Sequence, residues 1–123
     1  MRATLPTRRE DFPPNVEELA VQELSLFCLR KDGFTQELLI NSLRYSVPGG
    51  ETITTAEVRT TGGIVGTRRA SGAAWQVLVG KDPVGEWSIQ LENTELVRAW
   101  FRGGLIQDLV LVVTVAGVTS AWL

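Results

Sequence analysis

The stretch EWSIQLE, residues 86–92, alternates polar and apolar side chains without a break. Trp87, Ile89 and Leu91 fall on one face of an extended chain, because successive side chains of a β-strand point to opposite faces. The polar residues fall on the other face. The segment therefore predicts a strand with one face in a core and the other in solvent.

Further strands are predicted on both sides of this segment. In residues 21–29 both faces are apolar, with Leu24, Leu26 and Cys28 on one and Phe27 and Leu29 on the other, which is typical of a strand buried between layers. Residues 105–115 are almost continuously apolar and predict a central strand. The remaining predicted strands are residues 35–47 (the hairpin partner of 21–29), 51–60, 64–67, 75–79 and 118–123, the last as an edge strand or tail.

One short helix is predicted between residues 93 and 104. Asn93 or Thr94 is a suitable N-cap, and Gly103-Gly104 is a suitable end. Between them, Leu96, Val97, Trp100 and Phe101 form an apolar stripe at helical spacing.

The pattern as a whole predicts an all-β fold, an antiparallel, jelly-roll-like β-sandwich of seven to eight strands with one short helix. We expect the sandwich domain to occupy residues 16–123. Residues 1–15, with Pro6, Pro13 and Pro14, predict an extended leader or linker, or an arm that packs on a neighbour.

Composition excludes several classes of function. The 123-residue chain has no histidine, the commonest general base and transition-metal ligand, so we predict no enzyme activity, metal or cofactor. Cys28, the single cysteine, is predicted to be a small buried apolar side chain. The net charge of −2 argues against nucleic-acid binding, and the longest apolar run, residues 109–118, is too short for a membrane span.

The four tryptophans are the best candidates for contact with a ligand or partner. Trp87 and Trp100 lie on apolar faces and are predicted to be structural core residues. Trp75, near an arginine-containing loop, and Trp122, near the end of the chain, are predicted to contact a partner or glycan.

Charged residues offer weaker candidates. Arg68 and Arg69 are predicted to form a solvated loop that pairs with acidic groups of a partner. Glu86, Glu92 and Glu95 are acids on polar positions, and Asp108 precedes an apolar strand, where it is predicted to have a structural role, holding a loop amide or an arginine. The glycine pairs match no phosphate-binding pattern and are interpreted as turns.

Two segments resemble the end of the A subunit of bacterial insecticidal Tc (toxin complex) toxins. They are GEWSIQL, residues 85–91, and LIQDLVLVV, residues 105–113, joined by the predicted helix. The family closes with a Trp-x-hydrophobic-x-Leu strand and an Ile-x-Asp-hydrophobic strand. The resemblance covers about a third of this chain, which is far shorter than an A subunit and is either an excised domain or a small free-standing relative.

The resemblance implies a non-catalytic module that docks a B subunit during toxin assembly. The first residues, 1–6, contain a charge but no apolar signal-peptide core, so we expect no signal peptide and synthesis in the bacterial cytoplasm. The resemblance implies release with a larger toxin complex. A homo-oligomer of the chain is a further expectation. Two alternatives remain open, a carbohydrate-binding β-sandwich that recognises a surface glycan through Trp75 or Trp122, and a small hydrolase with two close carboxylates.

Overall fold

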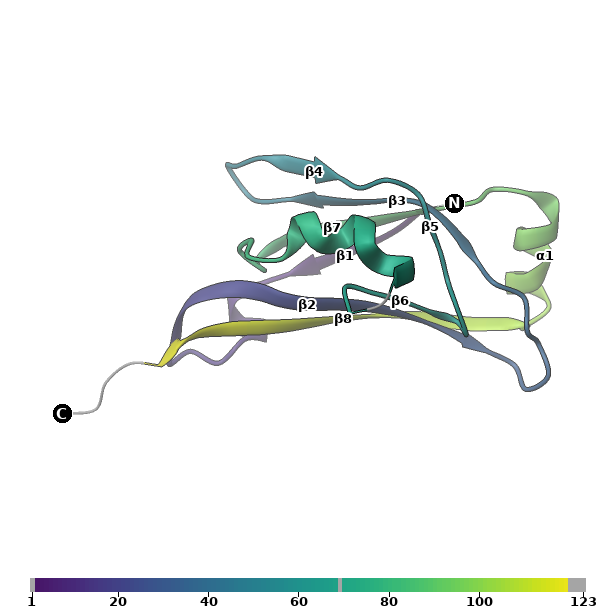
Figure 1. Cartoon of the computed structure of the whole chain (residues 1–123), viewed down its shortest axis with the longest axis horizontal. Helices are drawn as coiled ribbons and strands as arrows, with labels where there is room; N and C mark the ends of the chain where they lie inside the picture. The colour runs from purple at the N-terminus through teal and green to yellow at the C-terminus, as the bar shows by residue number, and fades with distance from the viewer. Residues whose placement is uncertain (1, 69, 120–123) are drawn as a thin grey trace.

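The computed structural model describes residues 2–68 and 70–119 and contains two antiparallel sheets stacked like a sandwich (Figure 1). The larger sheet has the order β1-β7-β3-β4, with β5 also paired to β3, and the smaller one has the order β6-β2-β8. The strands are β1 (Arg2–Thr7), β2 (Val16–Arg30), β3 (Leu39–Ser46), β4 (Thr52–Thr54), β5 (Val58–Arg59), β6 (Ile64–Gly66), β7 (Gly85–Leu91) and β8 (Ile106–Thr119). The helices are η1 (Arg9–Asp11), η2 (Ala70–Leu78) and α1 (Glu95–Arg102). The predicted mostly-β architecture with two sheets is confirmed.

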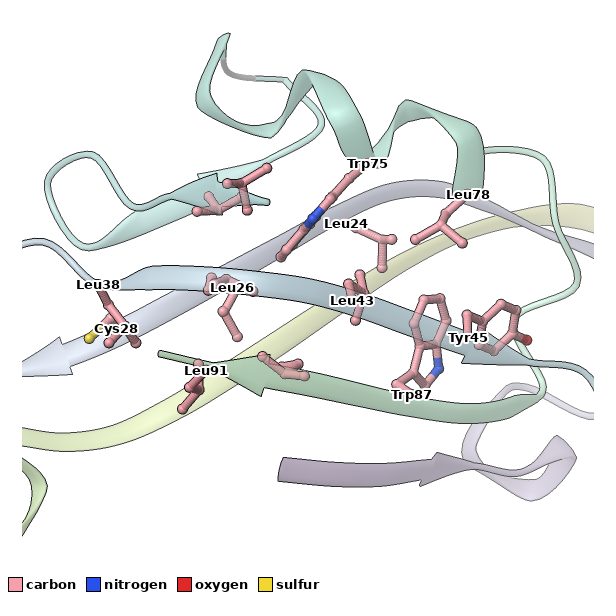
Figure 2. Close-up of a cluster of buried hydrophobic side chains, with 14 of the residues drawn as sticks. Leu24, Leu26, Cys28, Leu38, Leu43, Tyr45, Trp75, Leu78, Trp87 and Leu91 are labelled. Carbon is pink, nitrogen blue, oxygen red and sulfur yellow. The ribbon is translucent and has the colours of Figure 1, made fainter. Parts of the chain in front are cut away.

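The core lies between the two sheets (Figure 2). β7 supplies Trp87, Ile89 and Leu91, all buried, while Glu86 on the same strand is exposed. The alternation in residues 86–92 therefore predicted this strand correctly. Opposite it, Leu24, Leu26 and Cys28 of β2 alternate inward. The core also contains side chains of β3 and η2, among them Leu43, Tyr45, Trp75 and Leu78.

The predicted hairpin between residues 21–29 and 35–47 is wrong. β3 does not pair with β2 but lies in the opposite sheet, between β7 and the strands β4 and β5. A β-bulge between Ile40 and Ser42 shifts the register, so that Ile40, Leu43 and Tyr45 are buried and Asn41 is exposed. Because a bulge adds a residue on one strand, a strict period of two fails across it.

The predicted strand at residues 75–79 is also wrong, because these residues belong mostly to the 3₁₀ helix η2. Trp75 and Leu78 are fully buried, whereas Val77 and Val79 are 51% and 38% exposed. Residues three apart share a face in a 3₁₀ helix, and that spacing fits the burial better than strand alternation does.

α1 begins and ends where the sequence predicts. The Thr94 side chain accepts the N–H of Val97, Gly103 is the C-cap, and Gly104 has a φ of 73°. The apolar stripe is only partly correct, because Leu96 is 62% exposed.

The N-terminal segment is not a free leader over its whole length. Residues 2–7 form β1, which pairs antiparallel with β7. Pro6 is compatible with this position because β1 is an edge strand and one of its sides needs no N–H donor. Thr7 fixes the end of the strand, since its Oγ1 accepts the Nε1–H of Trp87 at 3.0 Å.

Three buried threonines each make two hydrogen bonds to the backbone of a leucine on a neighbouring segment. Each donates its backbone N–H to a leucine carbonyl and accepts the N–H of that leucine on its own Oγ1. The pairs are Thr55 with Leu43, Thr60 with Leu38 and Thr67 with Leu24, and the hydroxyl accepts at 3.0, 2.8 and 3.1 Å. The side chains thus replace ladder hydrogen bonds where short strands end.

We predict that Thr67→Val lowers the free energy of unfolding by about 1–3 kcal/mol. Valine has nearly the same shape, but it leaves the buried N–H of Leu24 without its hydroxyl acceptor. Urea denaturation measures the change, and Thr54→Val, at an exposed position of β4, is the matched control. Equal losses in both variants would contradict the proposed role of the hydroxyl.

Candidate functional site

An apolar patch covers the outer face of the smaller sheet. We call the side chains of Phe27 and Leu29 on β2, Ile64 on β6, and Val110 and Val112 on β8 the outer patch. Ladder pairing places Phe27 beside both Ile64 and Val110, and these residues alternate with the inward-facing ones. Leu29, Val110 and Val112 are 44%, 39% and 42% exposed. Among the residues that the structure describes, no helix covers this face, as Figure 1 shows for the lower layer.

Charged side chains lie at the two ends of the outer patch. At one end Arg68 Nε lies 3.0 Å from Glu23 Oε2, beside a hollow of about 380 Å³ that Phe27 and Ile64 also line. At the other end Asp108 pairs with Leu29 across the ladder. Arg68 is thus exposed, as predicted, but its acidic neighbour belongs to this chain. Arg69 lies outside the described residues.

β8 has a neighbour on only one side. It pairs with β2 along nearly its whole length and forms the edge of the sheet among the described residues, so the predicted central position is wrong. Asp108 is exposed, and its Oδ1 accepts the N–H of Leu109 at 2.8 Å. Asp108 was predicted to hold a loop amide or an arginine, and the partner found among the described residues is this strand amide of its neighbour Leu109.

The sandwich is open along β8. Leu109, Leu111 and Val113 point toward the core but remain only partly buried. η2 contacts β5 and β6, whereas β8 and β1 lie at the other edges of the two sheets. Leu5 of β1 is 47% exposed. Side chains that belong to a core by type and direction are therefore left in contact with solvent.

The tryptophans do not form an exposed binding platform among the described residues. Trp75, predicted to contact a partner or glycan, lies on η2 with its side chain fully buried in the core, so its ring is not accessible to either in this structure. Its Nε1 has no hydrogen-bond partner within the described part of the chain. Trp87 is fully buried, as predicted, and Trp100 is partly buried in a T-shaped contact with Phe34, the ring centroids 5.2 Å apart. Trp122 lies outside the described residues.

In the described ranges, the side chains that a catalytic or metal site would need are buried, paired with other charges or not grouped together. Cys28 is buried, and burial, the largest effect, raises the pKa of its thiol, which agrees with an apolar role. Glu95 pairs with Arg98 and Arg102 on its own helix. Within residues 2–68 and 70–119, no group of three potential metal ligands is found, and no helix has the length and apolar character to cross a membrane.

A polar network closes one end of the core. The Tyr45 and Trp87 rings stack with centroids 3.8 Å apart, and the Tyr45 hydroxyl donates to the carbonyl of Asp82. Burial, and secondarily the negative charge of Asp82, raise the pKa of Tyr45 to about 12. Gly85 lies against the same ring, where an added Cβ would come within 2.7 Å of a Tyr45 ring atom.

The comparisons with known proteins give no match. The sequence matches no protein-family model, and no curated protein and no solved structure is significantly similar to it.

The outer patch was missed as a surface, although its signal is present in the sequence. The two-sided apolar patterns of residues 21–29 and 105–115 predicted burial on both faces. The structure buries one face of each strand against the other sheet and leaves the second face in solvent.

We predict that the single tyrosine titrates near pH 12 in the folded protein, measured by absorbance at 295 nm. Because the folded pKa lies above the ordinary value of about 10, its contribution to stability is complete below pH 10 and is lost as the pH rises toward 12. Tyr45→Phe should remove this pH-dependent part of the unfolding free energy. A midpoint near pH 10 would show that the hydroxyl is in solvent.

Proposed function

We propose that this chain is a non-catalytic assembly module that buries its outer patch against a protein partner. The observation that supports the proposal is the combination of Phe27, Leu29, Ile64, Val110 and Val112 on one uncovered sheet face. Contiguous apolar patches of this kind mark interaction sites, because burying apolar surface contributes about 25 cal/mol per Å².

The charges around the outer patch suit a polar rim. The Glu23–Arg68 pair lies at one end, with the Arg68 side chain 76% exposed, and the Asp108 carboxylate lies at the other. Rim charges of opposite sign contribute more to orientation and to the rate of encounter than to affinity. A partner with complementary charges would therefore dock in one direction along the strands.

The resemblance to the end of Tc toxin A subunits suggests the kind of partner. The residues that carry it, Gly85–Leu91 and Leu105–Val113, form β7 and most of β8. Two of the five members of the outer patch, Val110 and Val112, lie in the second segment. On this proposal the chain has a jelly-roll-like sandwich and binds the B subunit of a toxin complex.

The carbohydrate-binding alternative has less support. It depended on Trp75 and Trp122 as stacking platforms, and Trp75 is fully buried. In the outer patch Phe27 is the one aromatic side chain, and it is partly buried.

We predict that Leu29→Lys weakens binding to a purified Tc toxin B subunit at least tenfold, because a buried ammonium loses its hydration. Leu96→Lys, the same change at an exposed helix position, is the control and should bind as the wild type does. Isothermal titration calorimetry measures both. Equal binding by all three proteins would exclude the outer patch, and no binding by the wild type would exclude this partner. A saturable tryptophan-fluorescence response to a glycan panel would favour the alternative.

A further inference from the structure

We propose that two copies of this chain pair antiparallel through the free edges of β8, joining their three-stranded sheets into one six-stranded sheet. This inference goes beyond the proposed function, because it concerns the backbone edge of β8 rather than the outer patch. It starts from the backbone groups that the fold leaves on that edge.

Alternate residues of β8 direct their N–H and C=O groups away from β2. In an antiparallel ladder every second residue bonds to the neighbouring strand and the others face outward. The Leu109 N–H bonds to the Asp108 side chain, which identifies Leu109 as a residue whose backbone groups face the free edge, although its side chain points toward the core. Leu111, Val113 and Val115 follow at the same spacing, and no strand within the described ranges lies along their side.

The β2 side of the ladder confirms this assignment. Val21 pairs with Val115, yet its own N–H and C=O bond to Lys81 and Gly80 on the far side of β2. Val21 and Val115 are therefore a non-hydrogen-bonded pair, and the Val115 N–H faces the free edge.

The free edge lacks the charges and prolines that keep many natural edge strands apart. From Leu109 to Thr119 there is no charged residue and no proline. The edge strand β1, by contrast, carries Arg2 and Pro6. Charges, prolines and short lengths ordinarily prevent edge-to-edge pairing, and β8 is 14 residues long. Asp108 shields one outward N–H and leaves those of Leu111, Val113 and Val115.

A second copy fits this edge in charge and in side-chain pattern. In the register centred on Val112, nearly the whole of β8 overlaps its copy. Leu109 then faces Val115 of the second copy and Leu111 faces Val113, so core-facing side chains meet core-facing ones. Asp108 lies opposite Ala116, so the two copies of Asp108 stand at opposite ends and do not repel. An uncharged strand offers a highly charged partner no charged group to pair with. Two copies of this strand can pair with each other because no like charges come to lie opposite one another.

The pairing also accounts for the open side of the sandwich. A second copy along β8 would approach Leu109, Leu111 and Val113, the core side chains that are only partly buried. The same residues thus present both their backbone groups and their apolar side chains to the partner.

The register is tested by disulfide trapping with Val112→Cys. Val112 would face its own copy in a non-hydrogen-bonded pair, where Cα atoms lie about 4.5 Å apart, close enough for a disulfide. Val110→Cys is the matched control, because its two copies would lie about 14 Å apart along the strands. The wild type is a second control, since its Cys28 is buried.

Under mild oxidation we expect a reducible covalent dimer from Val112→Cys and none from the controls. Cross-linking of Val112→Cys no faster than that of Val110→Cys would overturn the inference.

The edge itself is tested by sedimentation of Val115→Pro, with Val115→Thr as the control that keeps the N–H. Proline removes the N–H that faces the free edge in each copy and keeps the hydrogen bonds to β2. Self-association should therefore weaken at least tenfold. The circular dichroism spectrum should remain that of the wild type, which shows that the variant is folded. Leu29→Lys changes the outer patch and should leave self-association unchanged, which separates this inference from the proposed function. A wild type that is monomeric at all concentrations, or dimers that Leu29→Lys dissociates, would contradict edge pairing.

Discussion

The antiparallel ladder between β2 and β8 is the constraint on which the rest of the structure depends. It fixes which side chains of both strands face the core and which face solvent, because a shift of the pairing by one residue would turn every side chain to the other face of the sheet. Leu24 and Leu26 then meet the Trp87 face of β7, while Phe27 is directed outward beside Val110. The core, the outer patch and the free edge are therefore consequences of one register.

The short strands are held by a different interaction. β4, β5 and β6 have two or three residues each, too few to form a stable ladder alone. Thr55, Thr60 and Thr67 each add a side-chain acceptor to a backbone donor at the point where these strands end. The chain can therefore cross between sheets without leaving the N–H groups of Leu24, Leu38 and Leu43 unpaired in the core.

Sequence reasoning succeeded where local pattern alone determines the structure. The alternation in β7 and the caps of α1 are set by neighbours within a few residues, and both were predicted. The bulge in β3 and the 3₁₀ helix η2 were not, since each depends on how distant strands close around Trp75 and Leu43. The sequence showed that the residues of the outer patch are apolar. It did not show that they are exposed, because exposure depends on whether another layer packs on this face of the sheet, and the local sequence pattern does not determine that.

The contrast between β7 and β8 carries the functional argument furthest. β7 has a strand on each side, yet its outward residues are Glu86, Ser88 and Gln90, which suit contact with water. Among the described residues β8 has a neighbouring strand on only one side, yet its solvent-facing side chains include Val110 and Val112. Solvation would favour polar residues at both sets of positions, and the packing of the isolated chain gives no reason for the difference. An apolar face on an unprotected edge strand is explained if β8 is buried in an assembly, with its edge against one molecule and its face against another.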